Sequence, residues 1–111
     1  PTIDGILTLG PSAATPMLAA VEEAGLTGKL HTGTFDLSTD VLNAIKAGNM
    51  EFAIDQQQYI QGYDALMFMI QYIQTKNLPT GDGTGLIVTG PGFVTKDNAD
   101  AVISLAAAGL R

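Results

Sequence analysis

Short apolar runs alternate along this chain with longer segments of helical period, and this alternation restricts its fold more than any other feature. Strands are predicted at residues 6–9, 30–35, 52–55 and 86–89, and helices at 11–24, 39–47, 58–76 and 101–108. Parallel strands need a long crossover connection, which is usually a helix. The pattern therefore predicts an α/β fold in which a parallel sheet carries flanking helices.

Residues with special backbone preferences mark where some of these elements begin and end. Ser38 or Thr39 can cap the second helix, because a hydroxyl oxygen accepts a hydrogen bond from a free N–H of the first turn. Gly48 can end the same helix. The glycines at 81, 83 and 85 predict a turn before the last strand. This loop follows a helix and precedes a strand, which is the reverse of what a phosphate-binding loop requires.

Composition places the chain among small globular domains and argues against several kinds of partner. Its 111 residues form one domain at most, and 46% hydrophobic residues are enough for a packed core. The formal net charge is −6 and the five Lys and Arg residues are scattered singly, so neither nucleic acid nor a membrane surface is an expected partner. The absence of Cys excludes disulfides and thiolate chemistry.

Because the chain begins at Pro1, we expect a processed product, an expressed segment or a fragment.

The predicted helix at 58–76 is apolar around nearly its whole circumference, which is typical of a helix that is buried on most sides. Its apolar residues are Tyr59, Ile60, Tyr63, Leu66, Met67, Phe68, Met69, Ile70, Tyr72 and Ile73. A few short strands cannot cover all of them. We expect that the missing part of a larger protein covers this helix, and that an isolated fragment can form a homo-oligomer through it.

Two of the predicted strands end at polar side chains that are suited to binding hydroxyl groups. Asp36 follows the second strand and Gln56 follows the third. Ligands of open parallel α/β sheets bind at the carboxyl ends of the strands. A carboxylate can accept hydrogen bonds from two hydroxyls, and an amide can both donate and accept. Phe35 can pack on an apolar ligand face. Spacing alone fits a capping carboxylate at Asp36 and a solvated amide at Gln56 equally well, and a phenylalanine at the position of Phe35 is more often a core residue.

The remaining candidates carry weaker signals. Gly10 and Ser12 lie where a strand meets a helix N-terminus, whose free N–H groups can hold polar or anionic groups, although Pro11 removes one donor. His31 is the only histidine and is interpreted as structural. The scattered carboxylates, Asp55 among them, are interpreted as solvated surface. No constellation predicts catalysis, a metal site or a bound cofactor.

Several segments taken together resemble the type I periplasmic sugar-binding proteins of ABC importers, the group that includes ribose- and inositol-type binders. The resemblance runs from residue 3 to about residue 92, and it rests on 4–7 (DGIL), 33–36 (GTFD), 44–48 (AIKAG), 52–57 (FAIDQQ) and 62–63 (GY). It implies two α/β lobes joined by three crossing segments. A monosaccharide or polyol would bind in the cleft between the lobes, and the protein would have no enzymatic activity.

The resemblance also implies roles for individual residues. Asp36 matches the cleft aspartate of this family and Gln56 its hinge-proximal glutamine, both of which hydrogen-bond the sugar. Gly10 and Pro11 stand where many members carry an Asn-Asp pair. Backbone groups and Ser12 would therefore replace that contact with the ligand.

The same resemblance implies a place for the chain in a larger protein. Residues 1–111 would be its C-terminal portion, with 1–55 in the C-terminal lobe and 56–111 forming a hinge-crossing helix, a return strand and a terminal helix. The partners implied are a small sugar or polyol, the missing N-terminal lobe and an ABC permease. The location implied is the periplasm, or the outer surface of a monoderm cell with a lipid anchor. The alternative is the sugar-sensing effector domain of a LacI-type transcription regulator, which resembles the same fold.

Overall fold

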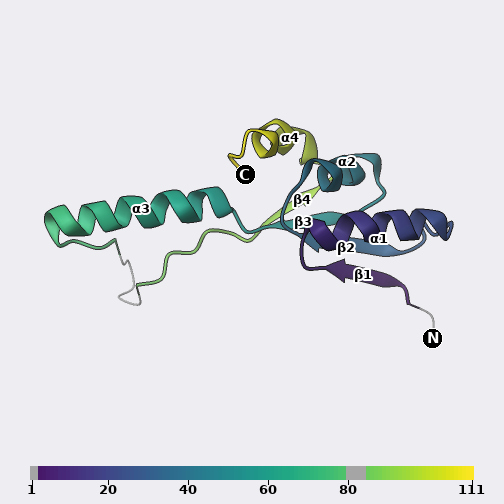
Figure 1. The fold of residues 1–111 in the computed structure, drawn as a ribbon, viewed down its shortest axis with the longest axis horizontal. Coiled ribbons are helices and arrows are strands. Elements are labelled where there is room, and N and C mark those ends of the chain that lie inside the picture. Colours follow the sequence, from purple (N-terminus) through teal and green to yellow (C-terminus); the bar gives the residue numbers. More distant parts are fainter. Residues whose placement is uncertain (1–2, 80–84) are drawn as a thin grey trace.

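The computed structural model describes residues 3–79 and 85–111, in which four strands alternate with four helices (Figure 1). The elements are β1 (Gly5–Thr8), α1 (Pro11–Glu23), β2 (His31–Phe35), α2 (Thr39–Ala47), β3 (Phe52–Asp55), α3 (Gln58–Thr75), β4 (Gly92–Thr95) and α4 (Ala99–Ala107). The first six confirm the sequence prediction to within one residue at each end. The turn predicted at glycines 81 and 83 lies outside the described residues.

The sheet is parallel except at one edge. Its strand order is β1-β2-β3-β4, and the first three strands run parallel. β4 is antiparallel to β3, with Ala53 opposite Val94. The chain leaves β3 into α3 and returns along an extended path to the same end of β3, so the only direction in which it can re-enter the sheet is antiparallel (Figure 1). The predicted α/β fold with a parallel sheet and flanking helices is therefore confirmed, and only its last strand departs from the parallel arrangement.

The strand predicted at residues 86–89 is also wrong. This segment has no regular secondary structure, and the strand forms a few residues later, at Gly92–Thr95. Ile87 and Thr89 line a cavity together with Phe68 of α3, so the segment runs beside that helix without strand pairing. Apolar β-branched residues favour a strand, but a strand also needs a neighbour that supplies hydrogen bonds.

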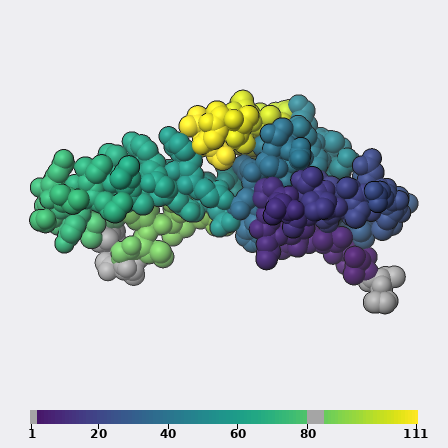
Figure 2. Space-filling view, viewed as in Figure 1, coloured from purple at the N-terminus to yellow at the C-terminus, as the bar shows by residue number. Residues whose placement is uncertain are grey.

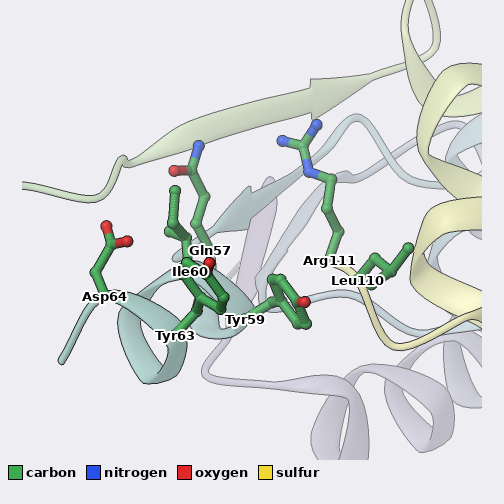
Figure 3. A pocket seen from close by; sticks show the side chains of 7 residues that line it. All are labelled: Gln57, Tyr59, Ile60, Tyr63, Asp64, Leu110 and Arg111. Atoms are coloured by element: carbon green, nitrogen blue, oxygen red, sulfur yellow. The ribbon is translucent and has the colours of Figure 1, made fainter. Parts of the chain in front are cut away.

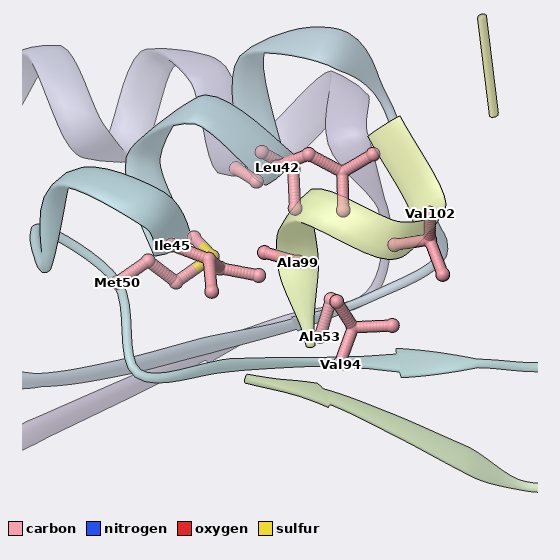
Figure 4. Packing of buried hydrophobic residues seen from close by; sticks show 9 residues of the cluster. Leu42, Ile45, Met50, Ala53, Val94, Ala99 and Val102 are labelled. Atoms are coloured by element: carbon pink, nitrogen blue, oxygen red, sulfur yellow. The ribbon is translucent and has the colours of Figure 1, made fainter. Parts of the chain in front are cut away.

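One face of the sheet is covered by α1, α2 and α4, and the hydrophobic core lies there (Figure 4). Leu42 and Ile45 of α2 are fully buried above Ala53 and Val94 of the two adjacent strands. The ends of α2 are those that the sequence predicted. The Ser38 hydroxyl accepts a hydrogen bond from the N–H of Val41 at 3.2 Å, and Gly48 adopts the left-handed conformation that closes the helix.

The opposite face of the sheet carries apolar side chains that the described residues leave partly exposed. Leu7 of β1 is 55% exposed and Phe93 of β4 is 57% exposed. The rings of Phe52 and Phe93 lie 5.8 Å apart between centroids on this face. Phe52 also lies over Gly33, where an added Cβ would come within 2.5 Å of the ring. Only glycine therefore lets the ring lie this close to β2.

α3 projects away from the sheet and its helices (Figures 1 and 2). It contains no buried residue, and the molecule measures 59 × 32 × 23 Å along its principal axes. Nine of its large apolar side chains are exposed, which agrees with the apolar circumference read from the sequence. What covers the helix stays a prediction. None of the helices described is long and apolar enough to cross a membrane.

We expect Leu42→Ala to lower the free energy of unfolding by about 3 kcal/mol, because it opens a cavity in a fully buried cluster. Leu66→Ala on α3 is the matched control. Its side chain is 56% exposed, so the expected loss is below about 1 kcal/mol. Urea denaturation of the two variants measures both values. Equal losses would contradict the separation between a covered core and an uncovered α3.

Candidate functional site

β1, β2 and β3 are parallel, so their carboxyl ends lie together at one end of the sheet, which we call its carboxyl edge. Thr8 lies opposite Thr34, and Phe35 lies opposite Ile54. Gly10, Asp36 and Gln56 follow these positions by one or two residues. The strand ends that the sequence selected are therefore neighbours in space.

Asp36 and Gln56 are joined by a hydrogen bond at this edge. The Nε2 group of Gln56 donates to Oδ1 of Asp36 at 2.8 Å. The Nε2 group of Gln58, the first residue of α3, donates to the same oxygen. Gln61 of α3 donates through Nε2 to the backbone carbonyl of Gln56 at 2.6 Å. Three glutamines and one carboxylate thus form a polar cluster at the strand ends.

The backbone conformation of Asp36 directs its side chain into this cluster. Its φ angle of 61° lies in the left-handed region, which an aspartate adopts more readily than most residues. The N–H of Asp36 donates to the carbonyl of Ile54 at 2.9 Å, so the first residue after β2 remains attached to β3. Strand alternation cannot predict the direction of a side chain on such a backbone.

The sequence analysis missed Gln58 and Gln61. Both lie in the first turns of α3, where polar residues normally face water. The available signal was the density of glutamine: four of the six residues from 56 to 61 are Gln. Their contact with Asp36 depends on the angle between β3 and α3, which the sequence pattern does not contain.

A cavity of about 310 Å³ lies beside the cluster. Phe35, Ile54 and Gln56 line it from the sheet side, and Gln61 lines it from α3. The return segment at 88–91 forms the rest of its wall. Of the residues predicted from the sequence, Phe35 and Gln56 line this cavity. Asp36 does not line it, but it accepts a hydrogen bond from Gln56.

Gly10 and Ser12 do not line this cavity. Gly10 is buried, and its carbonyl accepts hydrogen bonds from the N–H groups of Ala13 and Ala14 at the start of α1. Ser12 is exposed in the first turn of α1, and no side chain caps this helix. Both residues lie at the correct edge of the sheet, but the described contacts give them no part in the polar cluster.

Asp55 corrects the sequence analysis, because it is fully buried and not solvated. Its Oδ2 atom accepts a hydrogen bond from Nε of Arg111 at 2.8 Å and forms an ion pair with Nη2 of Arg111 at 2.7 Å. Its Oδ1 atom accepts the N–H of Gln57 at 2.8 Å. The reason is strand parity: Asp55 shares a face with Ala53, beneath the helices, whereas Gln56 comes after the strand and bonds to Asp36.

A larger cavity of about 580 Å³ lies between the first turns of α3 and the last residues of the chain (Figure 3). Tyr59 and Tyr63 line it with stacked rings, 6.3 Å apart between centroids. Arg111 also lines it, but its guanidinium is already paired with Asp55. Size alone favours this cavity as a binding site. We place the candidate site at Asp36 and Gln56, because there several hydrogen-bonding groups converge on one carboxylate.

His31 lies at the start of β2, at the other end of that strand from Asp36. Its Nδ1 atom pairs with Oε1 of Glu51 at 2.5 Å, and both side chains are mainly exposed. The hydrogen bond to Glu51 and its negative charge raise the pKa of the His31 imidazole above its ordinary value. Within the described residues, no three His, Cys, Asp or Glu side chains cluster as metal ligands would.

The chain belongs to the periplasmic binding protein domain family, whose model matches residues 1–77. This assignment confirms the family resemblance inferred from the sequence motifs. Fold and site geometry agree with it, since the described sheet presents its polar strand ends at one edge, next to the segments that lead to and from α3.

Solved structures support the same family. The chain is similar to a carbohydrate transporter from Acidothermus cellulolyticus in complex with myo-inositol, with 38% identity, a TM-score of 0.83, and coverage of 98% of this chain and 37% of that one. It is also similar to the myo-inositol binding protein of Caulobacter, with 28% identity, a TM-score of 0.72, and coverage of 94% and 34%.

A third similar structure is an ABC transporter periplasmic solute binding protein from Actinobacillus succinogenes with bound D-allose. It has 26% identity, a TM-score of 0.76, and coverage of 89% of this chain and 33% of that one. The chain therefore spans about a third of the length of the structures it matches.

We expect Arg111→Met to lower the free energy of unfolding by about 2–3 kcal/mol, because it leaves the Asp55 carboxylate buried without its cation. This expected loss of stability is smaller than the loss for a fully buried ion pair, because the Arg111 side chain is 33% exposed. Lys46→Met is the matched control. It breaks an exposed pair with Asp100 at 2.6 Å, which should cost less than about 1 kcal/mol. Thermal and urea denaturation compare the two, and equal effects would contradict the structural importance of the buried pair.

We expect NMR titration of the His31 ring to give a pKa above the ordinary histidine value, and Glu51→Gln to return it toward that value. The pair stabilises the fold more strongly while His31 is protonated, because only then does it join two opposite charges. Its contribution is complete below the unfolded-state pKa and is lost as the pH rises through the higher folded-state pKa. An unshifted His31 in the wild-type chain would show that the pair does not form in solution.

Proposed function

We propose that this chain is the part of an ABC-importer solute-binding protein that holds a monosaccharide or polyol through Asp36 and Gln56. The observation that carries the proposal is the convergence of the two side chains, 2.8 Å apart, at the carboxyl edge of the sheet. Neutral sugars and polyols are recognised by their hydroxyl groups. A carboxylate accepts from hydroxyls, and an amide can both accept and donate, so the pair suits such a ligand.

The structural relatives support this ligand class. Those with bound myo-inositol and bound D-allose share a ligand chemistry, a ring that carries several hydroxyl groups. Their description as transport proteins supports the importer over the transcription regulator considered above. Phe35 and Ile54 line the cavity beside the polar cluster and can pack on the apolar face of a ring.

The packing supports a division of the chain between two lobes. β4 and α4 return to the sheet formed by the first three strands, whereas α3 and the segment at 85–90 project from it. We therefore assign the sheet and its three covering helices to one lobe, and the projecting part to the segments that cross into a second lobe. A ligand bound at Asp36 would lie between the two lobes and would be enclosed when they close.

Binding without catalysis is the role that these groups support. Buried hydrogen bonds confer specificity, because a ligand that leaves one polar group unpaired loses more than that bond. The closed protein would present itself to a membrane permease, in the periplasm or at the outer surface of a monoderm cell.

We expect Asp36→Ala, in a two-lobe protein that carries this chain, to weaken binding of myo-inositol or D-allose by about 1.5–3 kcal/mol, the value of a hydrogen bond to a charged acceptor. Calorimetric titration measures the change. Asp40→Ala is the matched control, since Asp40 is exposed in the first turn of α2. Unchanged affinity in Asp36→Ala would remove Asp36 from the site, and a wild-type protein that binds no sugar or polyol would refute the proposed function.

A further inference from the structure

We propose that Gln58 is a positioning residue of the ligand site, which together with Gln56 holds the Asp36 carboxylate so that only its second oxygen, Oδ2, is offered to ligand. The inference rests on the proposed function and adds a residue that the sequence pattern did not select. Its basis is the convergence of two amide donors, from two different elements of the chain, on one carboxylate oxygen.

The hydrogen bonds that Asp36 already accepts determine which of its oxygens remains free to bind a ligand. Each carboxylate oxygen has about two acceptor sites, and the Nε2 groups of Gln56 and Gln58 occupy those of Oδ1. No described residue donates to Oδ2. None of the described Lys and Arg side chains forms an ion pair with Asp36, so its negative charge is not neutralised. Ligand hydroxyls therefore meet a single charged oxygen in a fixed orientation.

The three partners of this arrangement are themselves attached to different elements. The backbone of Asp36 bonds to Ile54 of β3, and the backbone carbonyl of Gln56 accepts from Gln61 of α3. Gln58 begins α3, so its side chain reaches from the projecting helix back to the end of β2. The orientation of the ligand-binding carboxylate is thereby tied to the position of the α3 first turn.

This geometry also restricts the class of ligand. An unneutralised carboxylate with one open oxygen accepts from one hydroxyl, or from two adjacent ones, and repels a carboxylate or phosphate on the ligand. We therefore infer neutral polyols and sugars as ligands, with sugar acids and sugar phosphates rejected.

The test uses Gln58→Glu and Gln58→Ala in a two-lobe protein that carries the chain, with myo-inositol and D-allose as probes. Glu keeps the length of Gln, and a negative charge at the start of a helix favours the helix. It removes the donor, however, and places a like charge beside Asp36. A purely structural role, in which the bond only attaches α3 to the end of β2, predicts lower stability with affinity close to wild type in Gln58→Glu. A positioning role predicts retained stability with a dissociation constant raised about tenfold or more.

Gln58→Ala should raise the dissociation constant by about three- to tenfold, since it removes the donor and adds no charge. Gln74→Ala is the matched control, because Gln74 is exposed near the other end of α3. A second measurement needs no ligand. The side-chain amide NMR signals of Gln58 in the 111-residue chain should shift on Asp36→Asn, while those of Gln74 should not.

The outcomes separate the two proposals. If Asp36→Ala weakens binding as expected but both Gln58 variants bind like wild type, the positioning role is overturned and the proposed function stands. If the side-chain amide signals of Gln58 do not shift on Asp36→Asn, the positioning role is also overturned. If wild type binds neither probe, the proposed function fails and the ligand role of Gln58 fails with it. Weak binding in Gln58→Glu together with intact stability supports the inference.

Discussion

The buried ion pair between Asp55 and Arg111 determines the geometry at the end of β3, on which the candidate site depends. Two guanidinium nitrogens of Arg111 contact one carboxylate oxygen of Asp55, and the N–H of Gln57 donates a hydrogen bond to the other. The strand therefore ends with Asp55 directed under the helices. The next residue, Gln56, bonds to Asp36, and Gln57 begins the turn into α3 in a left-handed conformation. A charge in the core thus orients the polar groups at the edge of the sheet.

The layer structure explains why the rest of the surface is so apolar. Three helices cover one face of the sheet, while Leu7 and Phe93 remain exposed on the other. α3 also exposes apolar side chains around its axis. Predominantly parallel sheets are normally covered on both faces. Since the chain spans about a third of the structures it matches, we expect these surfaces to pack against the remainder of a two-lobe protein.

Local signals predicted most of the fold correctly because they act within a few residues. The Ser38 hydroxyl and the left-handed Gly48 determine the ends of α2, and the short apolar run at 52–55 and the long apolar run after Gln58 identify β3 and α3. The failures all involve distant partners. The apolar run at 86–89 has strand propensity but lies beside α3, so the strand forms at Gly92–Thr95 instead. Asp55 looked like a surface acid because Arg111, its partner, is 56 residues away.

The sequence by itself determined the order of strands and helices, the family, and the two strand ends that bear Asp36 and Gln56, because apolar periodicity and short motifs are local properties. Only the tertiary structure decided the antiparallel return of β4, the burial of Asp55 and the convergence of Gln56 and Gln58 on Asp36. Each of these depends on which residues distant in sequence meet across the sheet edge. That choice is made by packing and charge pairing in three dimensions, and no local pattern contains it.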